Sequence, residues 1–341
     1  NYLVLETEAQ GFPCWTPYKG QLRLCAYSHL SSGANSVMYW HWHSIHNSYE
    51  TYWKGLLSHD FAENETYREA CIIGNEWKKI GSHLVDLNKK NDIAIMVSNE
   101  ALTALNWFGI QATSGENGTV FYNDVVRWIY DELYRMNIEC DFIWPQSEKL
   151  EQYKAIIIPA LYAVPDETLE RLRKYVKNGG CMLATFKSAF TDENVKVSTK
   201  IQPRIIGEAL GISYDQFTFP KDTKLTGSIF ESDPSGKTGE AKVFMELLRT
   251  DTAHALASYD HYMWGKYAAI TKNTYGKGNA YYMGCMTDSN TLQLVLSDML
   301  QQINVEIPDV RFPVIIRKGV NSHGKKICYY LNYSAEQREI E

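Results

Sequence analysis

The sequence predicts an α/β protein built in three parts, and three observations carry that prediction. Short apolar runs alternate with segments of helical periodicity from the first residues onward, which is typical of βα units. After residue 90 this alternation repeats several times, as a doubly wound, mostly parallel sheet requires. Beyond Pro308 short alternating strands predict an antiparallel β module. We therefore expect domains at 1–90, 91–304 and 305–341.

The first part contains two predicted βα units. The apolar run YLVLE predicts a buried strand that ends on Glu6. Apolar residues recur every three or four positions over 19–32 and predict a helix. The aromatic and β-branched run at 36–43 predicts a second strand, followed by a polar and aromatic loop at 44–60. Helical periodicity then returns over 62–89.

The second part opens with a predicted buried strand at 92–98, then a long loop and a helix over 123–136. A helix over 165–178 has Pro165 at its start, acidic residues in its first turn and two glycines after its end. The other predicted strands are CDFIWP, YKAIIIPA, CMLATF, KVFMELL, YAAITKN and GNAYYMG, and a last helix covers 291–303.

The third part consists of two predicted strands, RFPVIIRKG and KKICYYLNYS, around a turn at 321–324. A single hairpin cannot bury enough surface to be stable alone, so this β module looks incomplete. The chain also begins inside a strand and without an initiator Met, so we expect it to be an internal piece of a longer polypeptide.

Composition excludes several classes of partner. The net charge of -6 and the pI near 5.9 give no basic surface for nucleic acid or an anionic bilayer. No apolar run reaches the roughly 18 residues that a membrane span needs. The seven cysteines form no CxxC pair, which favours free thiols in a reducing compartment, and we expect a cytoplasmic protein. No motif calls for a cofactor, and we expect none.

Glu6 is the candidate catalytic carboxylate because chemistry in parallel α/β barrels lies at the carboxyl ends of strands. One interpretation is that this glutamate merely marks where the strand reaches water. The other is a glycosidase carboxylate that attacks an anomeric carbon while a second carboxyl protonates the leaving oxygen. Glu8 is a neighbouring competitor, but the apolar run ends at Glu6.

The second predicted strand offers an alternative chemistry. His41 and His43 lie on one face of it, a pattern that could bind a metal ion and support a metal-dependent hydrolase. All ligands would come from one short segment, so we expect no metal. Glu50 and Trp53 favour a sugar, because a carboxylate accepts hydrogen bonds from vicinal hydroxyls and an indole stacks on the apolar face of the ring.

The predicted sheet domain resembles glutamine-amidotransferase and flavodoxin-like folds but lacks their sites. It has no GxCxG or GxSxG elbow and no GxGxxG after its first strand. The turn after AIIIP is Ala160-Leu161-Tyr162, which contains no nucleophile. We interpret this domain as structural.

The order of motifs resembles the family 42 glycoside hydrolases, the microbial β-galactosidases. The residues that carry the likeness are Glu6 on its strand, Trp15, GQLRLCAYSHLSSGAN, VMYWHW, SYETYWKGLLSHD and TYREACIIGNEW. They look like the last two βα units of the family's TIM barrel. The remainder resembles the family's trimerisation domain and the start of its C-terminal β domain.

This resemblance implies a retaining β-galactosidase that acts on galactosides such as lactose or galacto-oligosaccharides, and a homotrimer. Glu6 matches the nucleophile, Trp15 the aromatic that lines the galactose subsite, and Glu50 the carboxylate that binds galactose hydroxyls. Trp53 stands where many members have His, which puts the contact to the axial hydroxyl in doubt. The family's Asn-Glu acid/base pair has no counterpart in this chain.

Two βα units cannot close an eight-stranded barrel, so we expect open edges that expose Val4, Leu5 and Val37. We accordingly expect no galactosidase activity from the chain alone. The alternative is a non-catalytic trimerisation module in which Glu6 has no role.

Overall fold

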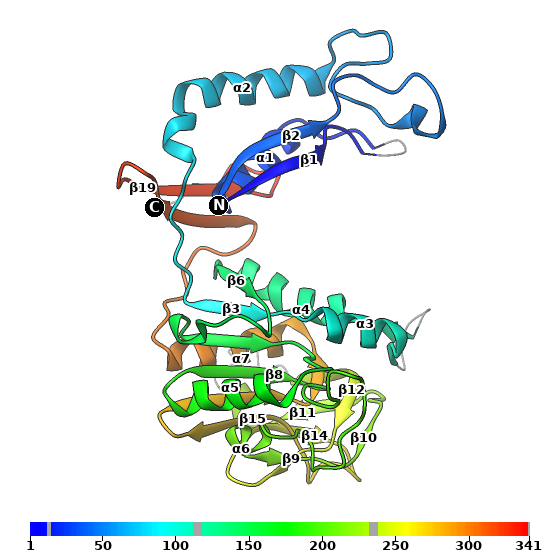
Figure 1. Cartoon of the computed structure of the whole chain (residues 1–341), viewed down its shortest axis with the longest axis vertical. Coiled ribbons are helices and arrows are strands. Elements are labelled where there is room, and N and C mark those ends of the chain that lie inside the picture. Colours follow the sequence, from blue (N-terminus) through cyan, green and yellow to red (C-terminus); the bar gives the residue numbers. More distant parts are fainter. Residues whose placement is uncertain (12–14, 112–117, 232–237, 340–341) are drawn as a thin grey trace. The chain divides into compact units, whose positions relative to one another are not determined.

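The computed structural model describes residues 1–11, 15–111, 118–231 and 238–339 (Figure 1). The chain divides into two compact units. Unit 1 comprises Asn1–Lys90 and Asp309–Glu341, and unit 2 comprises Asn91–Pro308. Within the described ranges no helix is long and apolar enough to cross a membrane.

Unit 1 begins with a strand, a helix and a second strand that lies parallel to the first. These are β1 (Tyr2–Glu8), α1 (Gln21–Ser31) and β2 (Ala34–Trp40). The loop that follows contains a short 3-10 helix, η1 (Tyr49–Tyr52), and leads to α2 (Glu65–Leu84). Leu22 and Ala26 of α1 and Ile73 of α2 form a small buried core with Tyr39 of β2 packed against it. The apolar spacing that predicts each helix therefore matches its buried face in part, since Ile80 of α2 and Cys25 of α1 are exposed.

Two boundaries in unit 1 differ from the sequence prediction. β1 does not end at Glu6 but continues to Glu8, because its pairing with β2 extends through Thr7 opposite Tyr39 and Glu8 opposite Trp40. Hydrogen bonding rather than the end of the apolar run sets this boundary. β2 ends at Trp40, so His41 and His43 lie in the following loop and not on a strand.

The prediction of a buried strand is wrong for β1, because none of its seven residues is buried. The exposure expected of an open edge is met only in part. Leu5 is 68% exposed, whereas Val4 and Val37 are half-buried.

The C-terminal hairpin packs within unit 1. Its strands are β18 (Val314–Val320) and β19 (Lys326–Asn332), and their inner face buries Ile315, Tyr329 and Leu331. Val320 exchanges two backbone hydrogen bonds with Asn88, at 2.7 and 3.0 Å. A lone hairpin is marginal in water, and here it gains apolar burial from the segment that follows α2.

Unit 2 is a mixed α/β structure around an 11-stranded sheet, counted over the described residues. Its parallel section runs in the order β16-β8-β7-β3-β6. These strands are β3 (Ile93–Met96), β6 (Cys140–Ile143), β7 (Ala155–Ile158), β8 (Cys181–Thr185) and β16 (Gly278–Met283). Antiparallel pairing extends the sheet through β10 (Phe217–Thr218), β11 (Lys224–Thr226), β12 (Gly239–Glu246), β14 (His254–Asp260), β15 (Ala268–Tyr275) and β17 (Cys285–Thr287).

Helices cover both faces of the parallel section (Figure 1). Ile93 and Ile95 of β3 point into a core with α3, α4 and α7, while Ala94 and Met96 point into a second core with α5 and α6. Successive side chains on a strand alternate between faces, so an unbroken apolar run signals burial on both. The helices are α3 (Asn99–Trp107), α4 (Tyr122–Arg135), α5 (Asp166–Lys177), α6 (Gly207–Leu210) and α7 (Ser289–Gln302).

Sequence reasoning missed α3, which occupies part of the predicted long loop. The signal was present, because Ser98 caps the helix by accepting a hydrogen bond from the Ala101 backbone N–H at 3.1 Å. The shorter elements of unit 2 are β4 (Ile110–Gln111), β5 (Thr119–Val120), β9 (Ile212–Ser213), β13 (Arg249–Thr250), η2 (Leu150–Gln152) and η3 (Ser228–Phe230).

Candidate functional site

A cavity of about 460 Å³ in unit 1 brings together three of the predicted site residues: Glu6, Trp15 and Trp53. A second carboxylate, Glu8, also lines it. The other lining residues are Thr7, Ala9, Pro17, Gln21, Leu22, Cys25. The cavity therefore combines carboxylates from β1 with two indole rings from separate segments. Glu50 is not among the lining residues.

Trp15 is held close to the end of β1 by a tight backbone approach. Its backbone N–H donates to the carbonyl of Gly11 at 3.1 Å. A Cβ atom added at Gly11 would lie 3.0 Å from Cε3 of Trp15 and 3.3 Å from a carboxylate oxygen of Glu8. A larger residue at position 11 would therefore press on the Trp15 indole and the Glu8 carboxylate. Cys14 and its two preceding residues lie outside the described ranges.

Trp53 sits at the end of η1, in a loop that folds back on the end of β2. The Trp53 backbone N–H donates to the Glu50 carbonyl at 2.8 Å, and the Trp53 carbonyl lies 3.3 Å from Nε2 of His41. The ring packs edge-on against Trp40, with centroids 6.5 Å apart. Glu50 thus contributes a backbone contact that positions Trp53, whereas its side chain is half-buried outside the cavity.

A polar chain ties the segment of Trp15 to the loop of Trp53. Gln10 is buried and its side-chain amide donates to the Gly55 carbonyl at 2.9 Å. Lys54 donates to Thr16 at 2.6 Å, and the Thr16 hydroxyl lies 3.5 Å from the Gln10 side-chain oxygen. Sequence reasoning missed these residues because nothing in their local pattern shows which distant backbone they meet.

Gly55 is a glycine that the local backbone requires. A Cβ atom there would lie 2.5 Å from the His41 carbonyl oxygen and 2.8 Å from that of His43. The close approach lets Leu56 and Leu57 donate backbone hydrogen bonds to His41 and Trp42, at 2.7 and 2.9 Å.

The histidines predicted as alternative metal ligands contact backbone carbonyls. His41 faces the Trp53 carbonyl, and Nδ1 of His43 lies 2.9 Å from the Ser44 carbonyl. Their ring centroids are 6.3 Å apart. Across the described part of the chain, no group of three His, Cys, Asp or Glu side chains is arranged to hold a metal ion.

Unit 2 contains a buried carboxylate that sequence reasoning did not single out. Glu246 of β12 accepts hydrogen bonds from the Lys187 backbone N–H at 2.8 Å and from the Tyr282 hydroxyl at 2.7 Å. Burial raises the pKa of Glu246 to about 7, opposed by these hydrogen bonds. Burial also lowers the pKa of the Lys187 ammonium, which lies 4.1 Å from the Phe244 ring centroid. A glutamate inside the apolar run KVFMELL is the signal that could have identified it.

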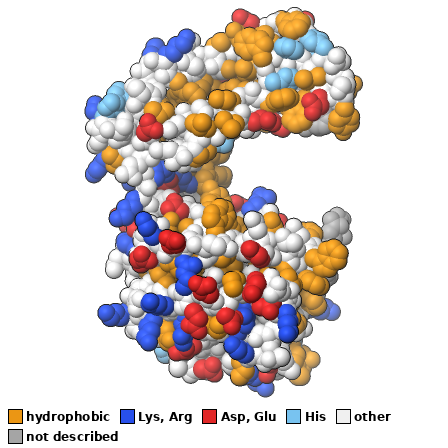
Figure 2. Space-filling view, in the orientation of Figure 1, with side chains coloured by type: hydrophobic (Ala, Val, Ile, Leu, Met, Phe, Trp, Pro, Cys, Tyr) orange, Lys and Arg blue, Asp and Glu red, His pale blue; other side chains and the backbone are white. Residues whose placement is uncertain are grey.

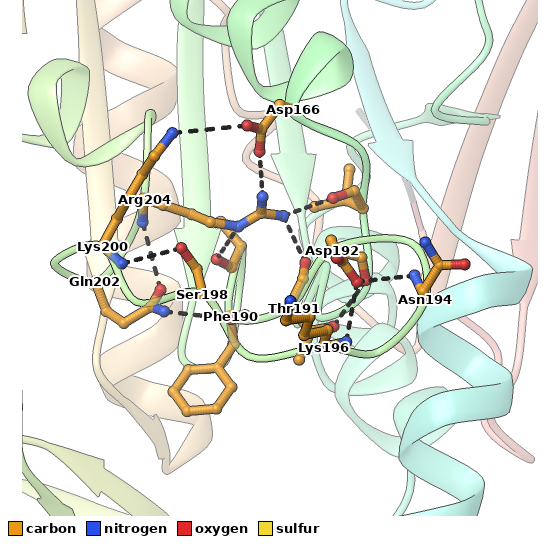
Figure 3. Close-up of polar contacts among 12 residues, drawn as sticks. Asp166, Phe190, Thr191, Asp192, Asn194, Lys196, Ser198, Lys200, Gln202 and Arg204 are labelled. Atoms are coloured by element: carbon orange, nitrogen blue, oxygen red, sulfur yellow. Dashed lines mark hydrogen bonds and ion pairs between the residues drawn. The ribbon is translucent and has the colours of Figure 1, made fainter.

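A second polar cluster in unit 2 organises the loop that follows β8 (Figure 3). Arg204 is buried, pairs with Asp166, and donates to the carbonyls of Ala189, Val164 and Thr191. The Asp192 carboxylate accepts from the backbone N–H groups of residues 194 and 196, each at 2.9 Å. Each guanidinium nitrogen of Arg204 already has a protein acceptor, so the cluster stabilises the loop and is not arranged as a ligand site.

Comparison with known families identifies two segments. Residues 91–306 match the family model described as the β-galactosidase trimerisation domain of glycoside hydrolase family 42. Residues 2–80 match the family 42 β-galactosidase model itself.

Individual relatives are similar over most of the chain. Beta-galactosidase BgaB of Geobacillus sp. (strain Y412MC61) is 31% identical over 287 residues, which is 84% of this chain and 41% of that relative. Beta-galactosidase LacZ of Heyndrickxia coagulans is 27% identical over 325 residues, which is 94% of this chain and 47% of that relative. The chain thus spans about half the length of the curated relatives it matches.

Solved structures match the fold. The crystal structure of β-galactosidase from Bacillus circulans sp. alkalophilus superposes with a TM-score of 0.87 at 24% identity, over 98% of this chain and 50% of that one. The β-galactosidase of Rahnella sp. R3 gives a TM-score of 0.86 at 21% identity, over 98% and 50%. The trimerisation-domain model alone matches more than half of the chain, and the chain therefore belongs to glycoside hydrolase family 42.

Proposed function

We propose that this chain is part of a retaining β-galactosidase that hydrolyses terminal β-D-galactosides, with Glu6 as the nucleophile. The observation that carries the proposal is the shared cavity of Glu6, Trp15 and Trp53. A cavity lined by a carboxylate and two indoles suits a sugar, because rings can stack on its C–H faces while the carboxylate faces the anomeric carbon. In this proposal β1 and β2 are the last strands of a TIM barrel, and unit 2 is a doubly wound domain.

The proposed reaction is a double displacement. The Glu6 carboxylate attacks the anomeric carbon and forms a galactosyl ester, while the bond to the leaving oxygen breaks and that oxygen takes a proton from a general acid. Water then cleaves the ester, giving up a proton to the same acid/base group, and Glu6 is restored. Trp15 and Trp53 would hold the sugar. The Glu50 carbonyl positions Trp53. The Glu50 carboxylate would accept hydrogen bonds from the galactose hydroxyls.

We further propose that the chain alone is inactive. The resemblance supplies a nucleophile but no counterpart of the Asn-Glu acid/base pair, and without an acid the departing alkoxide is a poor leaving group. Lactose or a galacto-oligosaccharide is the proposed substrate of the whole enzyme, and the cytoplasm its proposed location.

The proposed assembly is a homotrimer formed through unit 2, in keeping with the trimerisation-domain match over 91–306. A non-catalytic role as a trimerisation module is the second candidate, favoured by the same match. Light scattering and an activity assay of the chain alone do not distinguish the two candidates, because both predict a trimer without turnover. The graft described next distinguishes them.

The test of the nucleophile is a graft. The segment of the Geobacillus relative that matches this chain is replaced by the residues of this chain that match it, Glu6 included, and hydrolysis of a chromogenic β-galactoside is measured. We expect Glu6→Gln to lower kcat by at least about 1,000-fold, as loss of a catalytic nucleophile does. Glu8→Gln is the matched control, since Glu8 lines the same cavity, and we expect less than about a tenfold change.

The opposite ranking of the two variants would assign the nucleophile to Glu8. Equal activity of Glu6→Gln and the unsubstituted graft would leave only the trimerisation role.

A further inference from the structure

The sheet of unit 2 ends in two different strands, β6 at one edge and β10 at the other. Each edge carries two exposed aromatic side chains. Phe142 and Trp144, which we call the β6 patch, are 45% and 55% exposed. Phe217 and Phe219, which we call the β10 patch, are 49% and 43% exposed. Exposed aromatic side chains that lie together at an edge are candidates for a contact surface.

The β6 patch rests on ordered structure. The Phe142 ring packs against Tyr130 of α4, with centroids 5.6 Å apart. The Trp144 backbone N–H donates to the Ser147 hydroxyl at 3.0 Å, which fixes the chain as it leaves β6. Side chains held in this way lose little conformational freedom when a partner covers them.

The β10 patch is equally supported. Phe217 packs on Phe244 and Phe190, at centroid distances of 5.2 and 6.1 Å, and Phe219 lies 6.1 Å from Phe244. Phe217 also pairs with Glu246 of β12 in the ladder. By contrast, the face of unit 2 seen in Figure 2 carries Lys, Arg, Asp and Glu side chains of both signs, interspersed. Aromatic residues are enriched at the centres of interfaces, whereas Lys, Glu and Asp are depleted there.

Symmetry decides how two such patches can be used. A two-fold contact joins a patch to its own copy and stops at a dimer. A closed trimer requires a head-to-tail contact between two different patches on every copy. On the basis of the proposed trimer, we propose that the β6 patch of one copy binds the β10 patch of the next, closing a ring of three.

The test uses the whole chain and two double variants. Phe142→Glu with Trp144→Glu destroys the β6 patch, and Phe217→Glu with Phe219→Glu destroys the β10 patch. Tyr262→Glu is the matched control, because Tyr262 is 93% exposed in the connection between β14 and β15, neither of which is an edge strand. Mass is measured by light scattering after size exclusion, and circular dichroism checks that each variant is folded.

We expect the unsubstituted chain and Tyr262→Glu to be trimers and each double variant to be a monomer. Loss of a central aromatic contact weakens association on the order of 30-fold or more, and a buried glutamate adds to that loss. The decisive sample is a mixture of the two double variants. Each double variant retains the patch that the other has lost. One head-to-tail contact can therefore form, and the mixture should give a heterodimer and no trimer.

The outcomes separate this proposal from the proposed trimer. A trimeric chain whose double variants also stay trimeric would overturn the pairing of patches alone. Monomeric variants that give no heterodimer, or a variant that dimerises with itself through its remaining patch, would overturn it too. An unsubstituted chain that is not a trimer would overturn both proposals. If a double variant does not fold, Trp144→Lys and Phe219→Lys replace the two pairs, with the same heterodimer expected on mixing.

Discussion

Replacing Glu246 by Gln should remove a specific pH dependence from the stability of unit 2. The Glu246 side chain is almost fully buried, with the Lys187 backbone and the Tyr282 hydroxyl donating to it. The titratable side chains that interact with Glu246 are those of Lys187, Tyr214, Tyr259, Tyr282 and Cys285. A glutamine preserves the shape, can accept from the Lys187 N–H, and can donate to the Tyr282 oxygen. The variant therefore changes ionisation more than packing.

The magnitude follows from the shift in pKa. Burial raises the pKa of Glu246 from 4.5 to about 7. The unfolded chain therefore loses its proton first as pH rises. The free energy of unfolding falls from about pH 4.5 to about pH 7 and is constant above that. At about 1.4 kcal/mol for each pKa unit, this fall amounts to roughly 3 kcal/mol. A glutamine cannot ionise, so the variant lacks the fall and should be the more stable protein at pH 8.

The assay is urea unfolding at pH 5 and pH 8, followed by tryptophan fluorescence. The quantity compared is the pH-dependent change in the free energy of unfolding, wild type minus Glu246→Gln, in which the groups that do not interact with Glu246 cancel. Glu151→Gln, at an exposed glutamate of η2, is the matched control and should follow the wild type. Parallel pH dependences for the wild type and Glu246→Gln would refute the claim that Glu246 is buried with a raised pKa.

Two further predictions test the polar cluster around Arg204 and the approach of Gly11 to Trp15. Arg204→Ala should lower the free energy of unfolding by about 3–5 kcal/mol, because it leaves the carbonyls of Val164, Ala189 and Thr191 without their buried donor. Arg249→Ala, at an exposed pair, should cost less than about 1 kcal/mol in the same denaturation assay. Gly11→Ala should displace the Trp15 indole and raise KM in the active graft by about tenfold or more, while Gly74→Ala, where an added Cβ meets nothing within 4 Å, should leave KM unchanged.

Elements with strong periodicity could be predicted from the sequence. α5 begins directly after Pro165 and ends before the glycines that the pattern indicates, and β3, β7 and β8 coincide with apolar runs buried on both faces. α3 was missed although its capping serine is present in the sequence, whereas several missed strands depend on longer-range pairing. β11 and β14 are recognised only through their antiparallel partners, because their own sequences show little alternation.

In the candidate site, too, some residues could be predicted from the sequence and others could not. Glu6, Trp15 and Trp53 could be singled out by residue type and order, and they share one cavity. Gln10 and Gly55 could not, because their importance lies in a backbone approach between segments 45 residues apart. Glu50 was predicted for the site, but its side chain does not line the cavity, and its role in substrate binding stays a prediction.

The central claim is that Glu6 attacks the sugar, and a covalent label tests it most directly. The active graft is incubated with 2-deoxy-2-fluoro-β-galactosyl fluoride, which forms a long-lived galactosyl ester on the nucleophile of a retaining enzyme. Proteolysis and tandem mass spectrometry then locate the added mass. We predict the 2-fluorogalactosyl group on the Glu6 carboxylate and none in a Glu6→Gln graft. A label on Glu8, or an active graft that forms no covalent adduct, would contradict the assignment of Glu6 as the nucleophile.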